Sequence, residues 1–117
     1  MKYLCLIYSD ENRIASLSDN DSKSFLGEYM AFTDSIRNSG HLIASQRLRP
    51  THTATTIRSR NGKLSTTDGP FAETKEQLGG FYMIEAKDLD DAISVASRIP
   101  GTRVGSIEVR PVWEMGA

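Results

Sequence analysis

Residues 2–8 read Lys-Tyr-Leu-Cys-Leu-Ile-Tyr, a short apolar run that ends at the polar stretch Ser-Asp-Glu-Asn of residues 9–12. A run of this length and composition is typical of a β-strand. Its alternating side chains form two sets, and both sets are mostly apolar, so the strand is expected to be covered on both faces. The two sets are Tyr3, Cys5 and Ile7 on one side and Leu4, Leu6 and Tyr8 on the other.

The segments that follow predict a helix, a strand and a hairpin. Apolar side chains at 25, 29, 32 and 36 indicate an amphipathic helix, which Ser18 can cap and Ser39-Gly40 can end. Residues 42–46 predict a second strand. Asn61-Gly62, between the strand-like runs 54–58 and 63–67, is a strong signal for a two-residue hairpin turn.

The rest of the chain predicts strand, helix and strand. Residues 81–86 form another run with two apolar faces, entered through Gly79-Gly80. Asp88 can cap a helix that Pro100-Gly101 stops, and residues 106–112 alternate like a final strand. The order is βαββαβ with an extra hairpin. It predicts an α+β, ferredoxin-like antiparallel sheet with two helices on one face.

A second copy of the chain is the partner that this pattern predicts. Two helices cover one face of the sheet, yet two central strands are apolar on both faces. A second subunit is the simplest source of the missing layer, so we expect a homodimer.

Length and composition limit the class of protein. The 117 residues suit one domain, 1–117, with 38% hydrophobic and 25% charged residues. A net charge of -1 argues against nucleic acid as a partner. The apolar run is too short for a membrane span, so no membrane is expected. The single cysteine, Cys5, fits a cytoplasmic location.

A charged cluster follows the predicted hairpin. Its members are Asp68, Glu73, Lys75 and Glu76, which we expect close to Arg58 across the hairpin. A carboxylate in a partly buried pocket can act as an acid or base, which makes Asp68 the candidate catalytic residue, with Arg58 orienting an anionic group. The alternative is that Asp68 caps a turn and the others belong to a solvated loop.

Further candidates stand on other segments. Arg47, Arg49 and Arg58 could converge on an anionic ligand, or lie exposed. Tyr8, Tyr82 and Phe81 could line a ligand pocket, or belong to the core. His41, His52 and Cys5 lack metal-ligand spacing, so we expect no metal site and no cofactor, and a surface or capping role for both histidines.

The stretch 67–81, Thr-Asp-Gly-Pro-Phe-Ala-Glu-Thr-Lys-Glu-Gln-Leu-Gly-Gly-Phe, resembles the signature of the DGPF family, a branch of the YCII-related proteins. Residues similar to that family also occur at 1–4, 49–50, 54–58, 89–92, 99–100 and 105–112. The resemblance implies a dimeric α+β barrel. YCII-related proteins are suspected of enzymatic work through a His–Asp pair, and neither His41 nor His52 sits in a pattern that matches it. DGPF domains also resemble modules that accompany alternative sigma factors.

These observations lead to one main hypothesis and one alternative. The main hypothesis is a cytoplasmic homodimer that handles a small, possibly anionic molecule in a pocket between the sheet and the loop around Asp68, Glu73 and Lys75. The alternative is a non-catalytic regulatory or interaction module. The sequence leaves open whether the protein is an enzyme.

Overall fold

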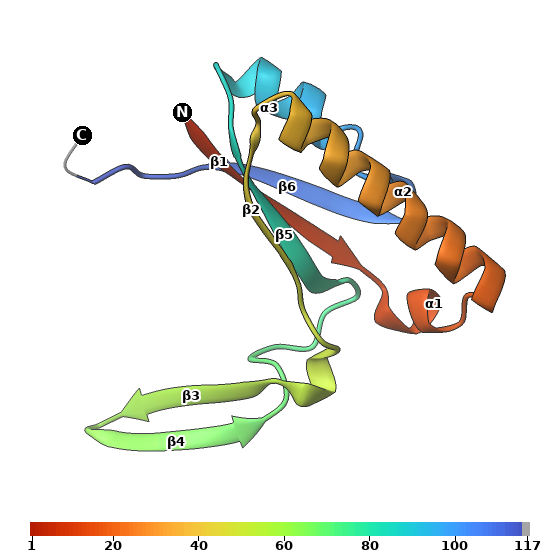
Figure 1. Cartoon of the computed structure of the whole chain (residues 1–117). Coiled ribbons are helices and arrows are strands. Elements are labelled where there is room, and N and C mark those ends of the chain that lie inside the picture. Colours follow the sequence, from red (N-terminus) through yellow and green to blue (C-terminus); the bar gives the residue numbers. More distant parts are fainter. Residues whose placement is uncertain (116–117) are drawn as a thin grey trace.

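The structure, a computed structural model, describes residues 1–115. Strands alternate with helices along the chain (Figure 1). The strands are β1 (Lys2–Ser9), β2 (Leu42–Arg47), β3 (Thr55–Arg60), β4 (Lys63–Asp68), β5 (Gln77–Glu85) and β6 (Gly105–Pro111). The α-helices are α1 (Glu11–Ala15), α2 (Asp19–Asn38) and α3 (Leu89–Ala96), and two 3-10 turns are η1 (Thr51–Thr53) and η2 (Pro100–Arg103).

The main sheet has the order β2-β5-β1-β6, and its neighbouring strands are antiparallel. The helices α2 and α3 both lie on one face of this sheet (Figure 1). This is the predicted ferredoxin-like arrangement, in which α2 and α3 each connect two strands that follow each other in the chain but are not neighbours in the sheet. The α+β fold class predicted from the sequence is therefore confirmed.

Local signals explain where the two long helices begin. The Ser18 side chain accepts a hydrogen bond from the backbone N–H of Asp21, and that of Asp88 accepts one from Asp91. Both caps were predicted, because short polar side chains satisfy the free N–H groups of a first helical turn. No helix within residues 1–115 has both the length and the apolar character needed to cross a bilayer.

Two elements differ from the prediction. Residues 11–15, predicted as loop, form α1, which is capped by Asp10 and too short to carry an apolar period. The strand β5 starts at Gln77 rather than Phe81, because Gly79 and Gly80 belong to the strand. A Cβ atom on Gly80 would lie 2.7 Å from the carbonyl oxygen of Gln46, so glycine permits the close approach of β2 there.

The core lies between the helices and the sheet. Cys5, Ile36, Ile84 and Ile99 are its most completely buried large side chains. Tyr3, Cys5 and Ile7 of β1 all face this core, which settles which alternating set lies beneath the helices. Burial raises the pKa of the Cys5 thiol to about 11, so Cys5 behaves as a small hydrophobic residue.

The other face of the sheet carries the second alternating set. Leu4, Leu6 and Tyr8 are half-buried there, and the register places Leu6 beside Phe81 and Leu4 beside Met83. We call these five residues the open face. The helices do not cover it (Figure 1), so it retains an apolar surface on two adjacent central strands.

The hairpin β3–β4 projects from the sheet as a separate two-stranded arm (Figure 1). Asn61 and Gly62 turn it with φ values of 54° and 75°, the positive φ pair of the predicted hairpin turn. Its strands are exposed along nearly their whole length, including Ile57 (63% exposed) and Leu64 (73%).

Candidate functional site

The arm separates the two residues expected to act together. Asp68 pairs with Thr55 at the base of the arm, whereas Arg58 pairs with Ser65. Side chains alternate between faces along a strand, so Asp68 and Arg58 lie on opposite faces of the arm. The Arg58 guanidinium instead donates a hydrogen bond to the carbonyl oxygen of Phe71, at 3.2 Å. Within one chain, Asp68 and Arg58 are therefore not placed to contact the same ligand molecule.

The loop after Asp68 is shaped mainly by its backbone. Gly69 has a φ of 101°, and its N–H donates to the carbonyl oxygen of Ala54 at 2.7 Å. The hydroxyl of Thr56 donates to the carbonyl oxygen of Gly69 at 2.8 Å. The side chains of Asp68, Glu73 and Lys75 are exposed. The backbone of Gly69, rather than the Asp68 carboxylate, closes this turn.

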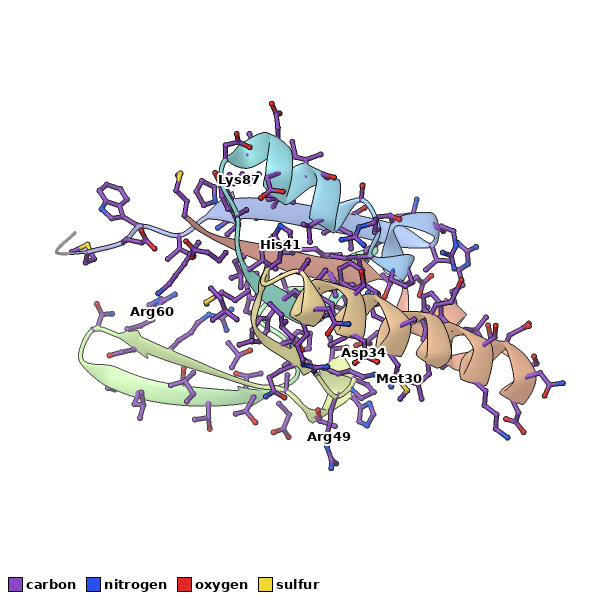
Figure 2. The ribbon with its side chains drawn as sticks, turned by 45° about the horizontal axis from the view of Figure 1, so that its top comes forward. Met30, Asp34, His41, Arg49, Arg60 and Lys87 are labelled. Atoms are coloured by element: carbon purple, nitrogen blue, oxygen red, sulfur yellow. The ribbon has the colours of Figure 1, made fainter. Side chains whose placement is uncertain are left out.

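The other residues predicted from the sequence lie apart from that loop. Tyr82 is in the core, where its hydroxyl shares a 2.7 Å hydrogen bond with the hydroxyl of Thr33. Tyr8 lies on the open face. Arg47 ends β2, and Arg49 points outward near the base of the arm (Figure 2). These arginines and Arg58 are thus on different elements.

A groove of about 340 Å³ lies between α1, α2 and η2. Its lining residues are Arg13, Ile14 and Leu17; Asp21, Ser24, Phe25 and Glu28 of α2; and Arg103 and Val104. Asp21, Ser24, Phe25 and Glu28 follow the i, i+3, i+4, i+7 spacing and therefore share one face of α2. The groove sits at the end of the sheet where Ser9 pairs with both Gln77 and Gly105. The loop of residues 69–76 enters β5 at this same end.

Both charged and apolar residues line the groove. Arg103 donates to the carboxylate of Glu28 at 2.6 Å, and both side chains are about half exposed (58% and 45%). Arg13 supplies a second guanidinium from α1, and Asp21 a second carboxylate. Phe25 and Val104 add apolar walls. Guanidinium groups beside an apolar wall suit a small molecule that carries a carboxylate.

Tyr29 packs against Phe25, one of the residues that line the groove. Its ring meets that of Phe25 edge to face, with centroids 5.2 Å apart. Burial raises the pKa of Tyr29 to about 12, although hydrogen bonding with the Gly101 backbone and the nearby charge of Arg103 act in the opposite direction. A Cβ atom on Gly101 would lie 2.6 Å from the Tyr29 hydroxyl oxygen. Glycine at 101 therefore lets η2 approach this neutral phenol closely.

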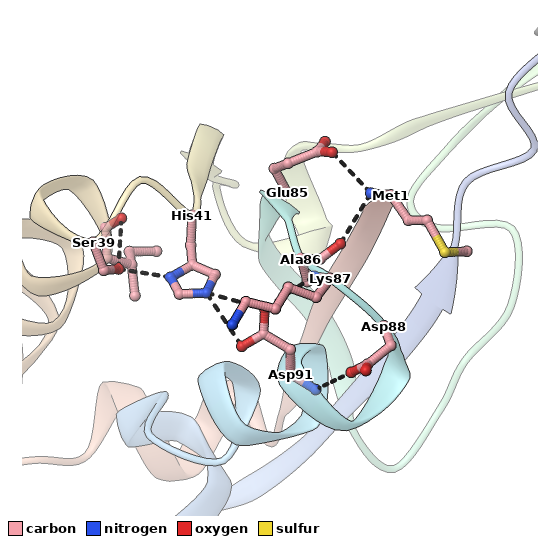
Figure 3. A network of polar contacts seen from close by, with 9 residues as sticks. Met1, Ser39, His41, Glu85, Ala86, Lys87, Asp88 and Asp91 are labelled. Carbon is pink, nitrogen blue, oxygen red and sulfur yellow. Dashed lines mark hydrogen bonds and ion pairs between the residues drawn. The ribbon is translucent and has the colours of Figure 1, made fainter.

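A second polar cluster joins the end of α2 to the start of α3 (Figure 3). The Nε2 atom of His41 lies 3.3 Å from each carboxylate oxygen of Asp91, and its Nδ1 atom lies 2.6 Å from the Ser39 hydroxyl oxygen. A carboxylate oxygen can only accept a hydrogen bond, so Nε2 is the donor to Asp91. Both His41 and Asp91 are about three-quarters buried.

This order of hydroxyl, imidazole and carboxylate is also found in nucleophilic sites. Here the outer groups have structural partners as well. The Ser39 hydroxyl contacts the carbonyl oxygen of Ile36 at 3.2 Å, and Asp91 accepts the backbone N–H of Lys87 at 3.0 Å. The pKa of Asp91 is lowered, first by this backbone N–H and then by the hydrogen bond and charge of His41. We interpret the cluster as a structural contact between two helices, in which His41 is mostly buried rather than on the surface.

Sequence reasoning missed the groove and the His41–Asp91 contact. The groove residues come from three short segments, and no spacing motif connects Arg13 with Arg103. Asp91 was recognisable only as an acidic residue in a first helical turn. Within residues 1–115, no three His, Cys, Asp or Glu side chains are grouped closely enough to hold a metal ion.

The fold and the groove define a small α+β protein with a polar and apolar recess at one end of its sheet. The YCII-related domain profile matches residues 1–116, and the chain belongs to the YCII-related family. An uncharacterised protein of Rhizobium meliloti (strain 1021) is 38% identical over 114 residues, which cover 96% of this chain and 92% of that protein.

One solved structure with this fold is 5-chloro-2-hydroxyhydroquinone dehydrochlorinase from Burkholderia phenoliruptrix AC1100, in complex with 2,5-dihydroxybenzoquinone. It superimposes with a TM-score of 0.56 over 99% of this chain and 96% of the other. The two sequences are 14% identical, so this likeness shows the fold alone.

Proposed function

We propose that the protein is a homodimer that binds a small organic acid in the groove between α1, α2 and η2. The observation that carries the proposal is a recess lined by Arg13 and Arg103 and by the apolar residues Phe25 and Val104, in which Asp21 and Glu28 balance the two arginine charges. Its volume of about 340 Å³ is at the lower end of the range for small-molecule sites. A ligand with a compact apolar body and one carboxylate matches this lining.

The ion pair within the groove explains how such a ligand would be held. Glu28 forms an ion pair with Arg103, and a ligand carboxylate would either displace Glu28 or bind Arg13. Because the Arg103–Glu28 pair is half exposed, separating it costs little, about 0–1 kcal/mol. A protein of the same fold holds a hydroxylated quinone, which supports a ring as the apolar body.

The experiment is a thermal unfolding screen with small aliphatic and aromatic carboxylates. A ligand at ten times its Kd should stabilise the protein by about 1.4 kcal/mol, or roughly 5 °C in Tm. Arg103→Ala and Arg13→Ala should each lose most of that shift. Arg37→Ala is the matched control, because Arg37 forms an exposed ion pair with Asp34 on the same helix as Glu28. If every carboxylate leaves Tm unchanged, or if Arg37→Ala loses the shift equally, the groove is not the site.

The proposal of a homodimer is based on the apolar residues of the open face. Leu4, Leu6, Tyr8, Phe81 and Met83 form an apolar surface on β1 and β5, which the helices leave uncovered. A sheet with one covered face normally keeps polar residues on the other. A second copy that packs sheet to sheet would bury this surface and close the two-layer architecture.

A further inference from the structure

The residues that line the groove between α1, α2 and η2 carry equal numbers of positive and negative charges. Arg13 and Arg103 supply the positive charges, and Asp21 and Glu28 supply the negative ones. A fixed carboxylate beside a guanidinium group repels a ligand that carries only a carboxylate, and it attracts a ligand that also carries a positive charge. The balance of charge therefore favours a ligand that has both.

Arg103 and Glu28 are the two opposite charges that the fold brings into contact in this groove. The guanidinium Nη2 atom lies 2.6 Å from a carboxylate oxygen of Glu28, and both side chains remain about half exposed, so a ligand can reach them from solvent. Asp21 lies seven positions before Glu28 on α2, which is roughly 10 Å along the helix axis. The head group of one small molecule therefore has Arg103 and Glu28 as its neighbouring partners.

A ligand that enters this ion pair changes the partners of both residues. A simple carboxylate that binds Arg103 leaves Glu28 without its cation and next to a like charge, and a simple amine that binds Glu28 leaves Arg103 without its anion. An α-amino acid carries its ammonium and carboxylate groups on the same carbon atom. Its carboxylate can accept from Arg103 while its ammonium group donates to Glu28, so every charge stays paired.

The apolar walls lie next to the same ion pair. Phe25 is one helical turn before Glu28 on the same face of α2, and Val104 directly follows Arg103. The ring of Tyr29 packs edge to face against Phe25, with centroids 5.2 Å apart, and so restricts the movement of that wall. An apolar side chain attached to the same carbon atom as the two charged groups would contact these walls.

We propose that the groove selects a free α-amino acid with an apolar side chain, whose carboxylate binds Arg103 and whose ammonium group binds Glu28. This inference rests on the proposed function and names the class of small acid. The ammonium group distinguishes this ligand from a simple organic acid. A peptide does not match the site, because its terminal ammonium and carboxylate groups belong to different residues.

The experiment compares three ligands that share one apolar side chain, by isothermal titration calorimetry. They are L-leucine, 4-methylpentanoate, which lacks the ammonium group, and L-leucinamide, which lacks the carboxylate. The titrations are done at about pH 6, where α-amino groups are protonated and glutamate is ionised. L-leucine should bind at least about fivefold more tightly than either analogue, a ratio that corresponds to about 1 kcal/mol.

Two variants test the role of Glu28 in this selection. Glu28→Gln keeps the length of the side chain and removes its charge. It should weaken binding of L-leucine about fivefold, and it should strengthen binding of 4-methylpentanoate, because Arg103 no longer has a competing carboxylate. Asp34→Asn is the matched control, because Asp34 is an exposed carboxylate of α2 that pairs with Arg37 outside the groove. It should leave the ratio of the two affinities unchanged, and circular dichroism checks that both variants are folded.

The outcomes separate this inference from the proposed function. If 4-methylpentanoate binds wild type as tightly as L-leucine, the groove still takes an organic acid and the selection of an amino acid is overturned. The same holds if L-leucinamide equals L-leucine, or if a folded Glu28→Gln variant keeps the wild-type ratio. If Asp34→Asn abolishes the ratio as Glu28→Gln does, the charge of Glu28 is not the cause. If neither these ligands nor the other carboxylates bind, both proposals fail.

Discussion

The imidazole of His41 and the carboxylate of Asp91 face each other across the gap between α2 and α3, with Nε2 at 3.3 Å from both oxygens. His41 precedes β2 and Asp91 lies in the first turn of α3. Ser39 fixes the ring from its other side at 2.6 Å. The contact thus joins the chain just before an edge strand to the helix that packs over the sheet.

The lowered pKa of Asp91 makes a prediction about acid stability. A carboxyl group whose pKa is lower in the folded state stabilises the fold above its ordinary pKa of 3.8, and that contribution disappears as the pH falls through the folded value. Asp91→Asn should therefore destabilise the protein near neutral pH, and the difference from wild type should shrink only as the pH falls below 3.8. Urea unfolding across this range measures it, with Asp90→Asn on the same helix as control. A difference independent of pH would contradict the assignment.

The turn after β4 predicts opposite results for two neighbours. Gly69→Ala should lower the free energy of unfolding by about 1–2 kcal/mol, because its φ of 101° disfavours a side chain. Asp68→Ala should stay within about 0.5 kcal/mol of wild type, as for an ordinary surface position. Chemical denaturation of both variants is the measurement. A loss of about 1–2 kcal/mol in Asp68→Ala would instead restore its predicted role as a turn cap.

Two other glycines form a matched pair. Gly80→Ala should destabilise the protein by about 1–3 kcal/mol, because its Cβ would meet the Gln46 carbonyl oxygen at 2.7 Å and β2 would have to move. Gly27→Ala should stabilise it by about 0.5–1 kcal/mol, because Gly27 lies inside α2 with nothing within 4 Å of its Cβ position. Thermal unfolding distinguishes the two. If both variants lose similar stability, the close approach of β2 is not the reason that position 80 requires glycine.

The open face predicts the effect of a charge at Leu6. Leu6→Asp should raise the dissociation constant of the homodimer at least a hundredfold, about 2.7 kcal/mol, because it places a carboxylate in an apolar interface. Sedimentation velocity measures association, and far-ultraviolet circular dichroism checks that the variant is folded. Leu26→Asp is the control, since Leu26 is 53% exposed on α2. A folded Leu6→Asp variant that still dimerises like wild type would move the interface to another surface.

The sequence determined most of the fold through local signals. Ser18 and Asp88 cap helices because short polar side chains satisfy free backbone N–H groups within three residues, and Asn61-Gly62 turns the arm because few other residues tolerate its positive φ. The two apolar faces of residues 2–8 also marked a central strand. Each of these signals depends on residues that are close together in the chain, so the sequence alone is enough to predict it.

The tertiary structure alone decided where the candidate sites lie. It turned Tyr3, Cys5 and Ile7 toward the helices and left Leu4 and Leu6 on the open face, a choice that an apolar pattern on both faces cannot make. It also brought Arg13 of α1 to the same groove as Arg103 of η2, and His41 to Asp91. These contacts depend on how separate elements dock, which is set by packing over the whole core rather than by any local spacing. The expected partnership of Arg58 and Asp68 shows the same limit, because the register of the arm puts them on opposite faces.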